Sequence, residues 1–495
     1  MIYSLLNKKI FLYKFLFISI FFFGIFLHVS YLYQFDDYYD DWNFFYTVDP
    51  NTTNKQTWER HYFGDRGEGF LKEAYPWNFT YLTKYFLKVF GYTIETTHYL
   101  ILTFTACSYL IFFKLINLIS KNYKFIILTL ILFSTNLFLI RELNSFRPHS
   151  LVLMLSLLSN YYFIKIYILK KRGFIDYFGY TFFTFGMLSF WPHTAALLTG
   201  HLVFLFITNI KNNNYFSKLF LPVVILFFYI LFNFKYIEYI LFDNDFSYTP
   251  FSPSFFINFF FRSFFGSLIF GGIVLLIFAF YLINEFKINI IYCVKNNFLN
   301  MPILKNNIKN FILINILTIY ISVISFSILK ESVIAGKYFL FLVPIIIIWL
   351  SLKITETKKY IYNIIVIFTF LNLVYYWNNV PIDRPPLREV LKILNKNNIK
   401  NIYSTESIVF NNYLSNYQYA IDNKLSVKKI GNLPQENKIY KFALVCLNYP
   451  RAFYGRNYSN FDDPKCLSFF NKENHTILKK ITITDFVIFI VKLKN

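Results

Sequence analysis

One stretch of sequence decides the fold: Ile10-Phe-Leu-Tyr-Lys-Phe-Leu-Phe-Ile-Ser-Ile-Phe-Phe-Phe-Gly-Ile-Phe-Leu-His-Val-Ser-Tyr-Leu-Tyr33. It is long enough to cross the apolar core of a bilayer, which takes about 20 helical residues. It is too long and too aromatic for a cleaved signal peptide, and no small-residue cleavage site follows it. Directly afterwards comes Gln34-Phe-Asp-Asp-Tyr-Tyr-Asp-Asp-Trp42, so a membrane helix is predicted to lead into an acidic loop.

The composition of the whole chain agrees with a membrane protein. Of its 495 residues, 56% are hydrophobic and only 15% are charged, which is more apolar surface than one soluble core could hide. The net charge of +22 would suit a nucleic-acid-binding protein. Here, however, Lys and Arg stand between apolar runs, where they set the orientation of membrane helices. We therefore expect membrane lipids, and no nucleic acid, as partners.

The same length criterion predicts about eleven transmembrane helices. Their approximate ranges are 10–33, 97–118, 124–141, 148–168, 176–193, 195–210, 219–241, 262–284, 311–329, 337–353 and 360–377. The sequence shows no internal repeat, which weighs against a transporter built from duplicated halves.

The connecting segments alternate between lysine-rich and lysine-poor, and the positive-inside rule puts the lysine-rich ones in the cytoplasm. These segments carry Lys8/Lys9/Lys14, Lys121/Lys124, Lys170/Lys171/Arg172, Lys211/Lys218, Lys287/Lys295/Lys305/Lys309 and Lys353/Lys358/Lys359. The amino terminus is then cytoplasmic, while the loop 34–95 and the region 380–495 lie outside. We expect a multi-pass protein of a bacterial inner (plasma) membrane.

Two parts are predicted: a membrane module over 1–377, which includes the loop 34–95, and an extracytoplasmic α/β domain over 380–495. In the second part, apolar residues alternate over 441–447 and 481–490, as is typical of strands, and 387–394 has helical spacing. None of the four cysteines has metal-ligand spacing. Cys446 and Cys466 could form a disulfide outside the cell.

The loop 34–95 holds ten of the 27 acidic residues of the chain. Asp36, Asp37, Asp40 and Asp41 fall so close together that they repel one another unless a cation, a proton or a substrate hydroxyl is present. A solvated loop is the simplest alternative, but the aromatic residues that follow suit a sugar-binding surface or a membrane interface. Paired aspartates could hold a divalent cation such as Mg²⁺ or Mn²⁺. No metal ligand is assigned.

Five short motifs follow one another along the chain: Asp40-Asp41, Tyr75-Pro-Trp-Asn-Phe-Thr-Tyr-Leu82 with Val89-Phe-Gly-Tyr-Thr93, Arg141-Glu-Leu-Asn-Ser-Phe-Arg-Pro-His-Ser-Leu151, Phe190-Trp-Pro-His193, and Gly336-Lys-Tyr-Phe-Leu-Phe-Leu-Val-Pro344. In this order they resemble the GT-C superfamily of glycosyltransferases. The likeness is closest to the branch of protein O-mannosyltransferases and lipid A aminoarabinose transferases, and it covers about the first 350 residues.

The resemblance implies an inverting enzyme that moves a sugar from a polyprenyl-phosphate carrier to an extracytoplasmic glycolipid, polysaccharide or protein. Asp40 or Asp41 would be the general base that takes the acceptor's proton, with Asp37 and Asp36 as alternatives. The substrate would be bound by Arg141, Arg147, His149, His193, Arg262, Lys337 and Tyr338. The cations at outer ends of spans would bind the donor's phosphate, and these are Arg141, Arg147, Arg262, Lys330 and Lys337.

The chain departs from that family's pattern in three places. Its acidic pair is Asp-Asp rather than Asp-Glu, and His149 stands where Tyr is usual. Lys337 replaces the commoner Arg, which gives a point charge rather than a bidentate fork. Snorkelling at the interface is an equally simple explanation for any single cation. The alternative functions are a polysaccharide polymerase or ligase, whose large loop usually lies late in the chain, and a lipid-linked sugar transporter, which would need charges at mid-membrane.

Overall fold

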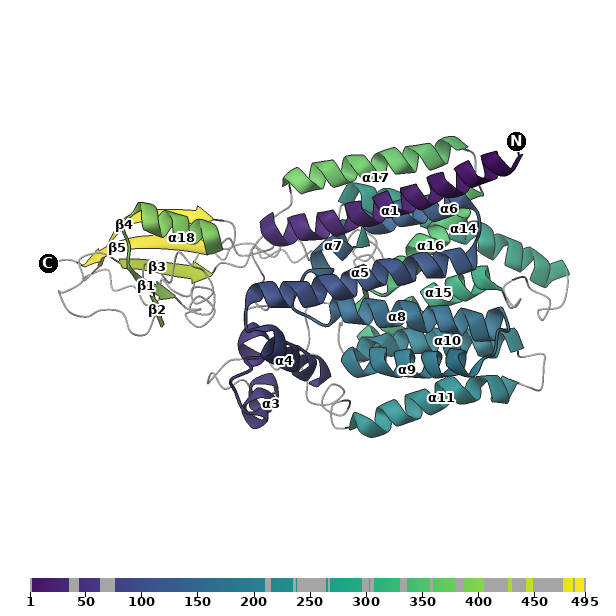
Figure 1. Ribbon diagram of the computed structural model, residues 1–495, viewed down its shortest axis with the longest axis horizontal. Coiled ribbons are helices and arrows are strands. Elements are labelled where there is room, and N and C mark those ends of the chain that lie inside the picture. Colours follow the sequence, from purple (N-terminus) through teal and green to yellow (C-terminus); the bar gives the residue numbers. More distant parts are fainter. Residues whose placement is uncertain are drawn as a thin grey trace. The chain divides into compact units, whose positions relative to one another are not determined.

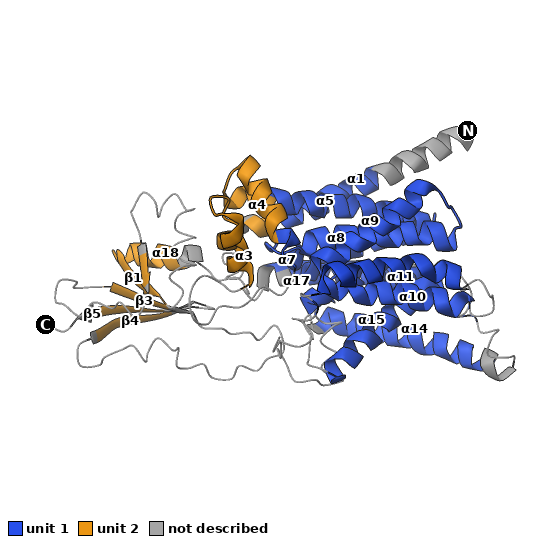
Figure 2. Cartoon of the chain, turned by 90° about the horizontal axis from the view of Figure 1, so that it is seen from below, with its two compact units in different colours: residues 1–29, 72–79, 99–379 blue, residues 30–71, 80–98, 380–495 orange. Residues whose placement is uncertain are grey.

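The computed structural model describes residues 2–34, 44–62, 76–209, 215–234, 237, 264–265, 268–295, 302, 307–329, 336–356, 359–379, 387–404, 426–429, 442–447, 475–483 and 486–493. The chain divides into two compact units (Figure 2). The first comprises Met1–Val29, Lys72–Phe79 and Tyr99–Asn379, and the second Ser30–Leu71, Thr80–His98 and Val380–Asn495.

Helices occupy each of the eleven ranges predicted to cross the membrane (Figure 1). They are α1 (Ile2–Gln34), α5 (Ile94–Ile119), α6 (Tyr123–Ser134) with α7 (Leu137–Leu143), α8 (His149–Phe163) continued by η1 (Ile164–Ile168), α9 (Phe174–Phe190), α10 (Ala195–Asn209), α11 (Tyr215–Phe232), α14 (Leu268–Lys295), α15 (Ile308–Leu329), α16 (Leu342–Thr355) and α17 (Lys359–Asn379).

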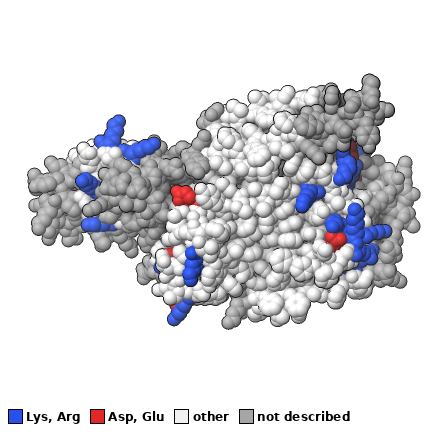
Figure 3. All heavy atoms as spheres, in the orientation of Figure 1, with Lys and Arg blue, Asp and Glu red and all other residues white. Residues whose placement is uncertain are grey.

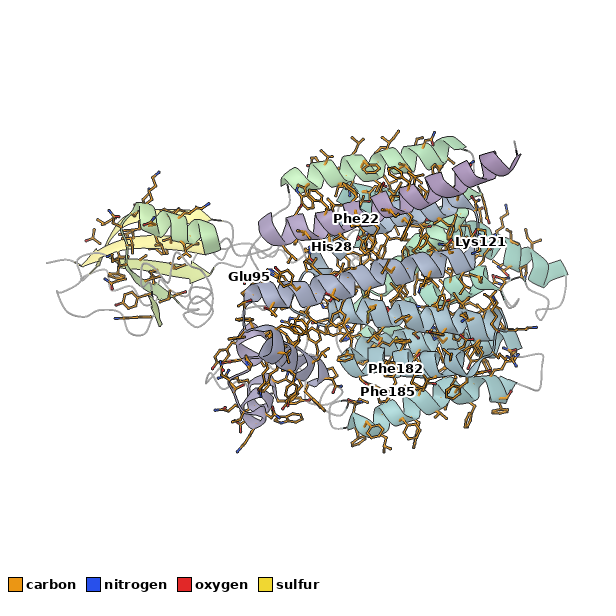
Figure 4. The ribbon with its side chains drawn as sticks, viewed as in Figure 1. Phe22, His28, Glu95, Lys121, Phe182 and Phe185 are labelled. Atoms are coloured by element: carbon orange, nitrogen blue, oxygen red, sulfur yellow. The ribbon has the colours of Figure 1, made fainter. Side chains whose placement is uncertain are left out.

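Five helices are long and apolar enough to cross a membrane, and the bent pair α6–α7 makes a sixth candidate. The five lie in α1, α5, α8 with η1, α14 and α15. Large apolar side chains point outward, such as Phe22 and Phe182, which are 64% and 58% exposed (Figure 4). The chain is therefore a mostly helical multi-pass membrane protein, as predicted. Eleven crossings stay a prediction, because α11, α16 and α17 contain shorter apolar helices.

Close contacts between small and large residues bring neighbouring helices together. α8 packs along α9, and α10 packs along α15. A Cβ atom on Gly179 would lie 2.7 Å from the ring of Tyr162, and one on Gly200 would collide with the side chain of Asn315. Small residues at such crossings let helix backbones approach closely, which is a main source of helix association in lipid.

A bend of 53° separates α6 from α7. The Asn136 side chain caps α7 by accepting a hydrogen bond from the Leu139 backbone N–H at 2.9 Å. Its Nδ2 donates to the Phe264 carbonyl oxygen at 2.7 Å, so the bend is fixed from a second segment. All seven residues of α7 are buried, including Arg141 and Glu142.

Two short helices, α3 (Asn54–Tyr62) and α4 (Asn78–Phe90), belong to the predicted loop 34–95. The side chains of Thr80 and His61 join them through a 2.9 Å hydrogen bond. Phe45 stacks on the ring of Tyr92 at 4.2 Å, and the Tyr92 hydroxyl donates to the Phe45 carbonyl oxygen. This loop therefore has its own hydrogen-bonded core.

The carboxy-terminal part contains α18 (Leu387–Lys396) beside a mixed five-stranded sheet (Figure 1). The strand order is β2-β1-β3-β5-β4, with β1 parallel to β2 and β3 and with β5 antiparallel to β3 and β4. The strands are β1 (Asn401–Ser404), β2 (Ser426–Lys429), β3 (Phe442–Leu447), β4 (His475–Ile483) and β5 (Phe486–Leu493).

This confirms the expected small α/β fold, with one correction. The run 481–490, taken as one alternating stretch, belongs to two antiparallel strands in which Ile483 pairs with Phe486. The residues between them, Thr484 and Asp485, lie outside the described residues. Cys466 also lies outside them, so its pairing with Cys446 stays a prediction.

Candidate functional site

A group of polar and aromatic side chains meets at one end of the helical unit. We call it the Glu142 cluster. Its residues come from the end of α7, the start of α8, the turn η2 (Pro192–Thr194) and the turn η6 (Gly336–Phe339). Its members are Arg141, Glu142, Arg147, His149, Trp191, His193, Lys337 and Tyr338.

The centre of the cluster is a buried ion pair between neighbours in the sequence. Arg141 donates from Nε and Nη2 to the Glu142 Oε1 atom, at 3.0 and 2.7 Å. The two side chains are only 6% and 4% exposed. Taking two charges out of water costs several kcal/mol per ion, so a buried pair stabilises a protein little by itself. Its presence in an apolar bundle calls for another explanation.

His149 contacts this pair through the Nδ1 edge of its ring. Its Nδ1 lies 3.1 Å from the Glu142 carbonyl oxygen and 3.7 Å from the Glu142 Oε2 atom. Because a carbonyl oxygen can only accept, this contact favours the tautomer with its proton on Nδ1. His149 is 2% exposed, and its Nε2 has no hydrogen-bond partner among the described residues. Such a nitrogen is an available acceptor, and it becomes a donor when the ring is protonated.

Aromatic contacts connect His149 to the turn η6. The His149 ring meets Trp191 edge to face at 5.2 Å, and Trp191 Nε1 donates to the Tyr338 carbonyl oxygen at 3.0 Å. His193 stacks on the Tyr338 ring, with centroids 4.7 Å apart and planes 9° from parallel. The His193 Nδ1 is buried and has no hydrogen-bond partner in the described part of the chain.

Among the described residues, the cluster has more cations than acids. Lys337 is half-buried, interacts electrostatically with Glu142 and His149, and makes no ion pair with a described acid. Arg147 also acts on His149 electrostatically. Three cations thus stand against one described acid. The low dielectric of an apolar bundle strengthens the attraction of such a site for an anion.

A buried contact links the first helix to this region. His28 points from α1 toward α5 and α7 (Figure 4), and Asn144 follows directly after α7. Asn144 Nδ2 donates to the His28 carbonyl oxygen at 3.2 Å, and the two side chains meet at 3.3 Å. The end of α1, beyond which the aspartates lie in the sequence, is therefore tied to the turn that carries the cluster.

The structure brings six of the seven predicted substrate-binding residues together. They are Arg141, Arg147, His149, His193, Lys337 and Tyr338. The seventh, Arg262, lies outside the described residues, as do Lys330, Asp36, Asp37, Asp40 and Asp41. In the described ranges no group of three or more His, Cys, Asp or Glu residues could hold a metal ion.

Glu142 and Trp191 were quoted in motifs, but neither was assigned a role from the sequence. The signal for Glu142 was present: it is an acid next to an arginine, between two apolar runs. We expected acidic function only in the loop 34–95. Trp191 could not have been singled out, because it lies between His149 and Tyr338 only in space, and no sequence spacing reveals this.

No protein-family model matches the chain, and the search of curated proteins gives no match either.

Proposed function

We propose that this chain is a membrane glycosyltransferase of the GT-C type, with eleven transmembrane helices, that moves a sugar from a polyprenyl-phosphate carrier to an extracytoplasmic acceptor. The acceptor is a glycolipid, a polysaccharide or a protein. The observation that carries the proposal is the Glu142 cluster, which unites cations and histidines from four segments at one end of the bundle. An anionic lipid headgroup is the ligand that such a place in a membrane protein suits best.

The proposed roles follow from the contacts. Lys337 and Arg147 supply the charge that stabilises the phosphate as it leaves the sugar, and His149 Nε2 is a nearby hydrogen-bonding atom with no partner among the described residues. Glu142 neutralises Arg141 and holds its guanidinium in place. Fixed donors in a site shielded from water need no rearrangement when the negative charge develops.

The proposed base belongs to the segment just after α1. His28 is bound to the cluster's turn, and α1 continues six residues beyond it to Gln34. At 1.5 Å per residue, this extension is about 9 Å long. Asp36, Asp37, Asp40 and Asp41 follow within seven residues. One of them takes the proton of the acceptor hydroxyl while that oxygen attacks the anomeric carbon and the polyprenyl phosphate departs.

The binding step is testable with purified full-length protein in nanodiscs and polyprenyl phosphate as the probe. A charge-assisted hydrogen bond contributes about 1.5–3 kcal/mol, so Lys337→Ala should weaken binding by roughly 10- to 100-fold. Lys309→Ala is the matched control, since this lysine pairs with Glu356 and is about half exposed. Polyprenol without phosphate should bind far more weakly. Equal affinities for the two lipids, or no effect of Lys337→Ala, would refute an anion site here.

The chemical step needs a separate experiment, with a sugar-loaded carrier. We expect Asp40→Asn or Asp41→Asn to bind polyprenyl phosphate normally and to abolish transfer. Retention of transfer by all four Asp→Asn variants would exclude the proposed base. A lipid-linked sugar transporter would bind the same headgroup but leave the donor chemically intact, so analysis of the donor after incubation separates the two functions.

A further inference from the structure

Helix α4 exposes an apolar face. Leu82, Tyr85 and Val89 recur at helical spacing and are 38%, 47% and 75% exposed, and the neighbouring Phe90 is 66% exposed. These positions form one continuous arc of the helix. Soluble helices turn such an arc toward a protein core.

The buried residues of α4 include polar side chains beside the apolar Phe79 and Leu87. Thr80, Thr83 and Lys84 are each at most 2% exposed. Lys84 Nζ donates to the Thr57 hydroxyl and to the Thr52 carbonyl oxygen, both at 2.7 Å. The buried lysine and threonines thus face protein, while Leu82, Val89 and Phe90 face outward. A helix surrounded by water is expected to expose polar residues instead.

Both ends of α4 are tied to membrane helices. Near its start, Asn78 Nδ2 donates to the Ser189 carbonyl oxygen at 2.9 Å, at the end of α9. At its other end only three residues, beginning with Gly91 at a φ of 106°, precede the candidate span that starts at Ile94. Three residues reach at most about 10 Å. Over its 13 residues, α4 rises roughly 20 Å, and a hydrogen bond at one end and a short chain connection at the other join it to membrane helices.

We propose that α4 is an interfacial helix whose face of Leu82, Tyr85, Val89 and Phe90 inserts into the adjacent leaflet of the membrane. The exposed Lys88 lies beside this face, where its charged end can reach the headgroups. Trp77, 39% exposed at the start of the helix, suits the same level, because Trp is enriched at membrane interfaces. The occupant is a lipid surface. This inference does not depend on glycosyl transfer.

Nitroxide labels at single introduced cysteines test the proposal in the full-length protein in phosphatidylcholine–phosphatidylglycerol vesicles. The four native cysteines are first replaced by serine. Val89→Cys and Phe90→Cys carry the label on the apolar face, and Lys55→Cys carries it on α3 of the same segment, where the lysine side chain is 86% exposed. Collision rates with oxygen, which concentrates in lipid, are compared with those of a water-soluble nickel chelate.

We expect labels at positions 89 and 90 to collide several-fold more with oxygen than with the chelate, and the label at 55 to show the opposite. Equal access to the chelate at all three positions would mean that the face lies in water, which overturns the proposal. Low access to both reagents at 89 and 90 would mean that protein, such as a second copy of this chain, covers the face. That outcome overturns it as well. All labelled positions are exposed, so none should prevent folding.

Discussion

Ion pairs at the two ends of the helical unit differ in their exposure to solvent. At one end, Lys and Arg gather on the surface (Figure 3), and ion pairs there reach the surface. Lys309 and Glu356, for example, are 53% and 48% exposed. At the other end, Arg141 and Glu142 form their pair almost completely out of reach of solvent. Surface pairs contribute at most about 1 kcal/mol, whereas a broken buried pair leaves an uncompensated charge. The exposed pairs at the first end cost little, whereas the second end retains an unfavourable arrangement that stability does not explain.

The largest effect should come from substituting the acid of each pair by its amide. Glu142→Gln removes the carboxylate with which Arg141 pairs among the described residues, and we expect the free energy of unfolding to fall by about 3–5 kcal/mol. Glu356→Gln makes the same chemical change at the other end and should lower it by less than about 1 kcal/mol. Reversible unfolding in bicelles, monitored by steric trapping, measures both values.

The double variant Arg141→Met/Glu142→Gln controls for lost packing. If the uncompensated charge is the cause, this variant should be more stable than Glu142→Gln alone, since no buried cation remains. Equal losses for Glu142→Gln and Glu356→Gln would instead show that solvent reaches both ends, and the contrast between them would disappear.

A second pair of variants distinguishes a structural histidine from one in the cluster. His201 is satisfied on both sides of its ring, by the Tyr180 hydroxyl and by Asn160 Oδ1, each at 3.1 Å. His201→Phe leaves these groups buried without that partner and should cost about 1–3 kcal/mol. His149→Phe removes a ring whose Nε2 has no partner in the described part of the chain, so it should cost less. It should, however, weaken polyprenyl-phosphate binding, while His201→Phe leaves binding unchanged. The opposite ranking would assign His149 a purely structural role.

Long apolar runs made the helices predictable, because a span of lipid demands a continuous apolar segment of known length. Side-chain partners across helices are harder to predict: His201 contacts Tyr180 of α9 and Asn160 of α8, and neither contact has a sequence signature. Alternation alone could not divide the run 481–490 into β4 and β5, since both strands have the same period.

The cluster was only partly predictable. Arg141 and Lys337 stood out because they oppose the positive-inside pattern, but nothing in their spacing said that they approach the same carboxylate. Glu142 becomes buried because α7 bends away from α6 at Asn136, and that bend depends on a contact with Phe264, over a hundred residues later. Such a contact has no local signature. The roles of the four aspartates stay predictions.

The smallest expected effect concerns Lys84, a buried cation that forms no ion pair with a described acid. It tests whether such a cation affects the free energy of unfolding differently from the paired charges of the Glu142 cluster. Burial lowers the pKa of Lys84, with smaller contributions from Lys88 and Arg60, and nearby Asp49 opposes the shift. The folded state therefore disfavours the charged lysine. Below the lowered pKa this penalty is constant, and as pH rises through it toward the ordinary value of 10.5 the unfolded chain holds the extra proton.

The free energy of unfolding of the wild type should consequently increase as pH rises from the lowered pKa of Lys84 toward 10.5. It should change less with pH in Lys84→Met. Each unit by which the pKa is lowered corresponds to about 1.4 kcal/mol. The measurement is the difference in unfolding free energy between the two proteins at several pH values up to 10.5, because other titrating groups cancel in this difference. A difference that does not change with pH would mean that the hydroxyl and carbonyl acceptors around Lys84 compensate its charge fully, and that a buried cation here needs no carboxylate partner.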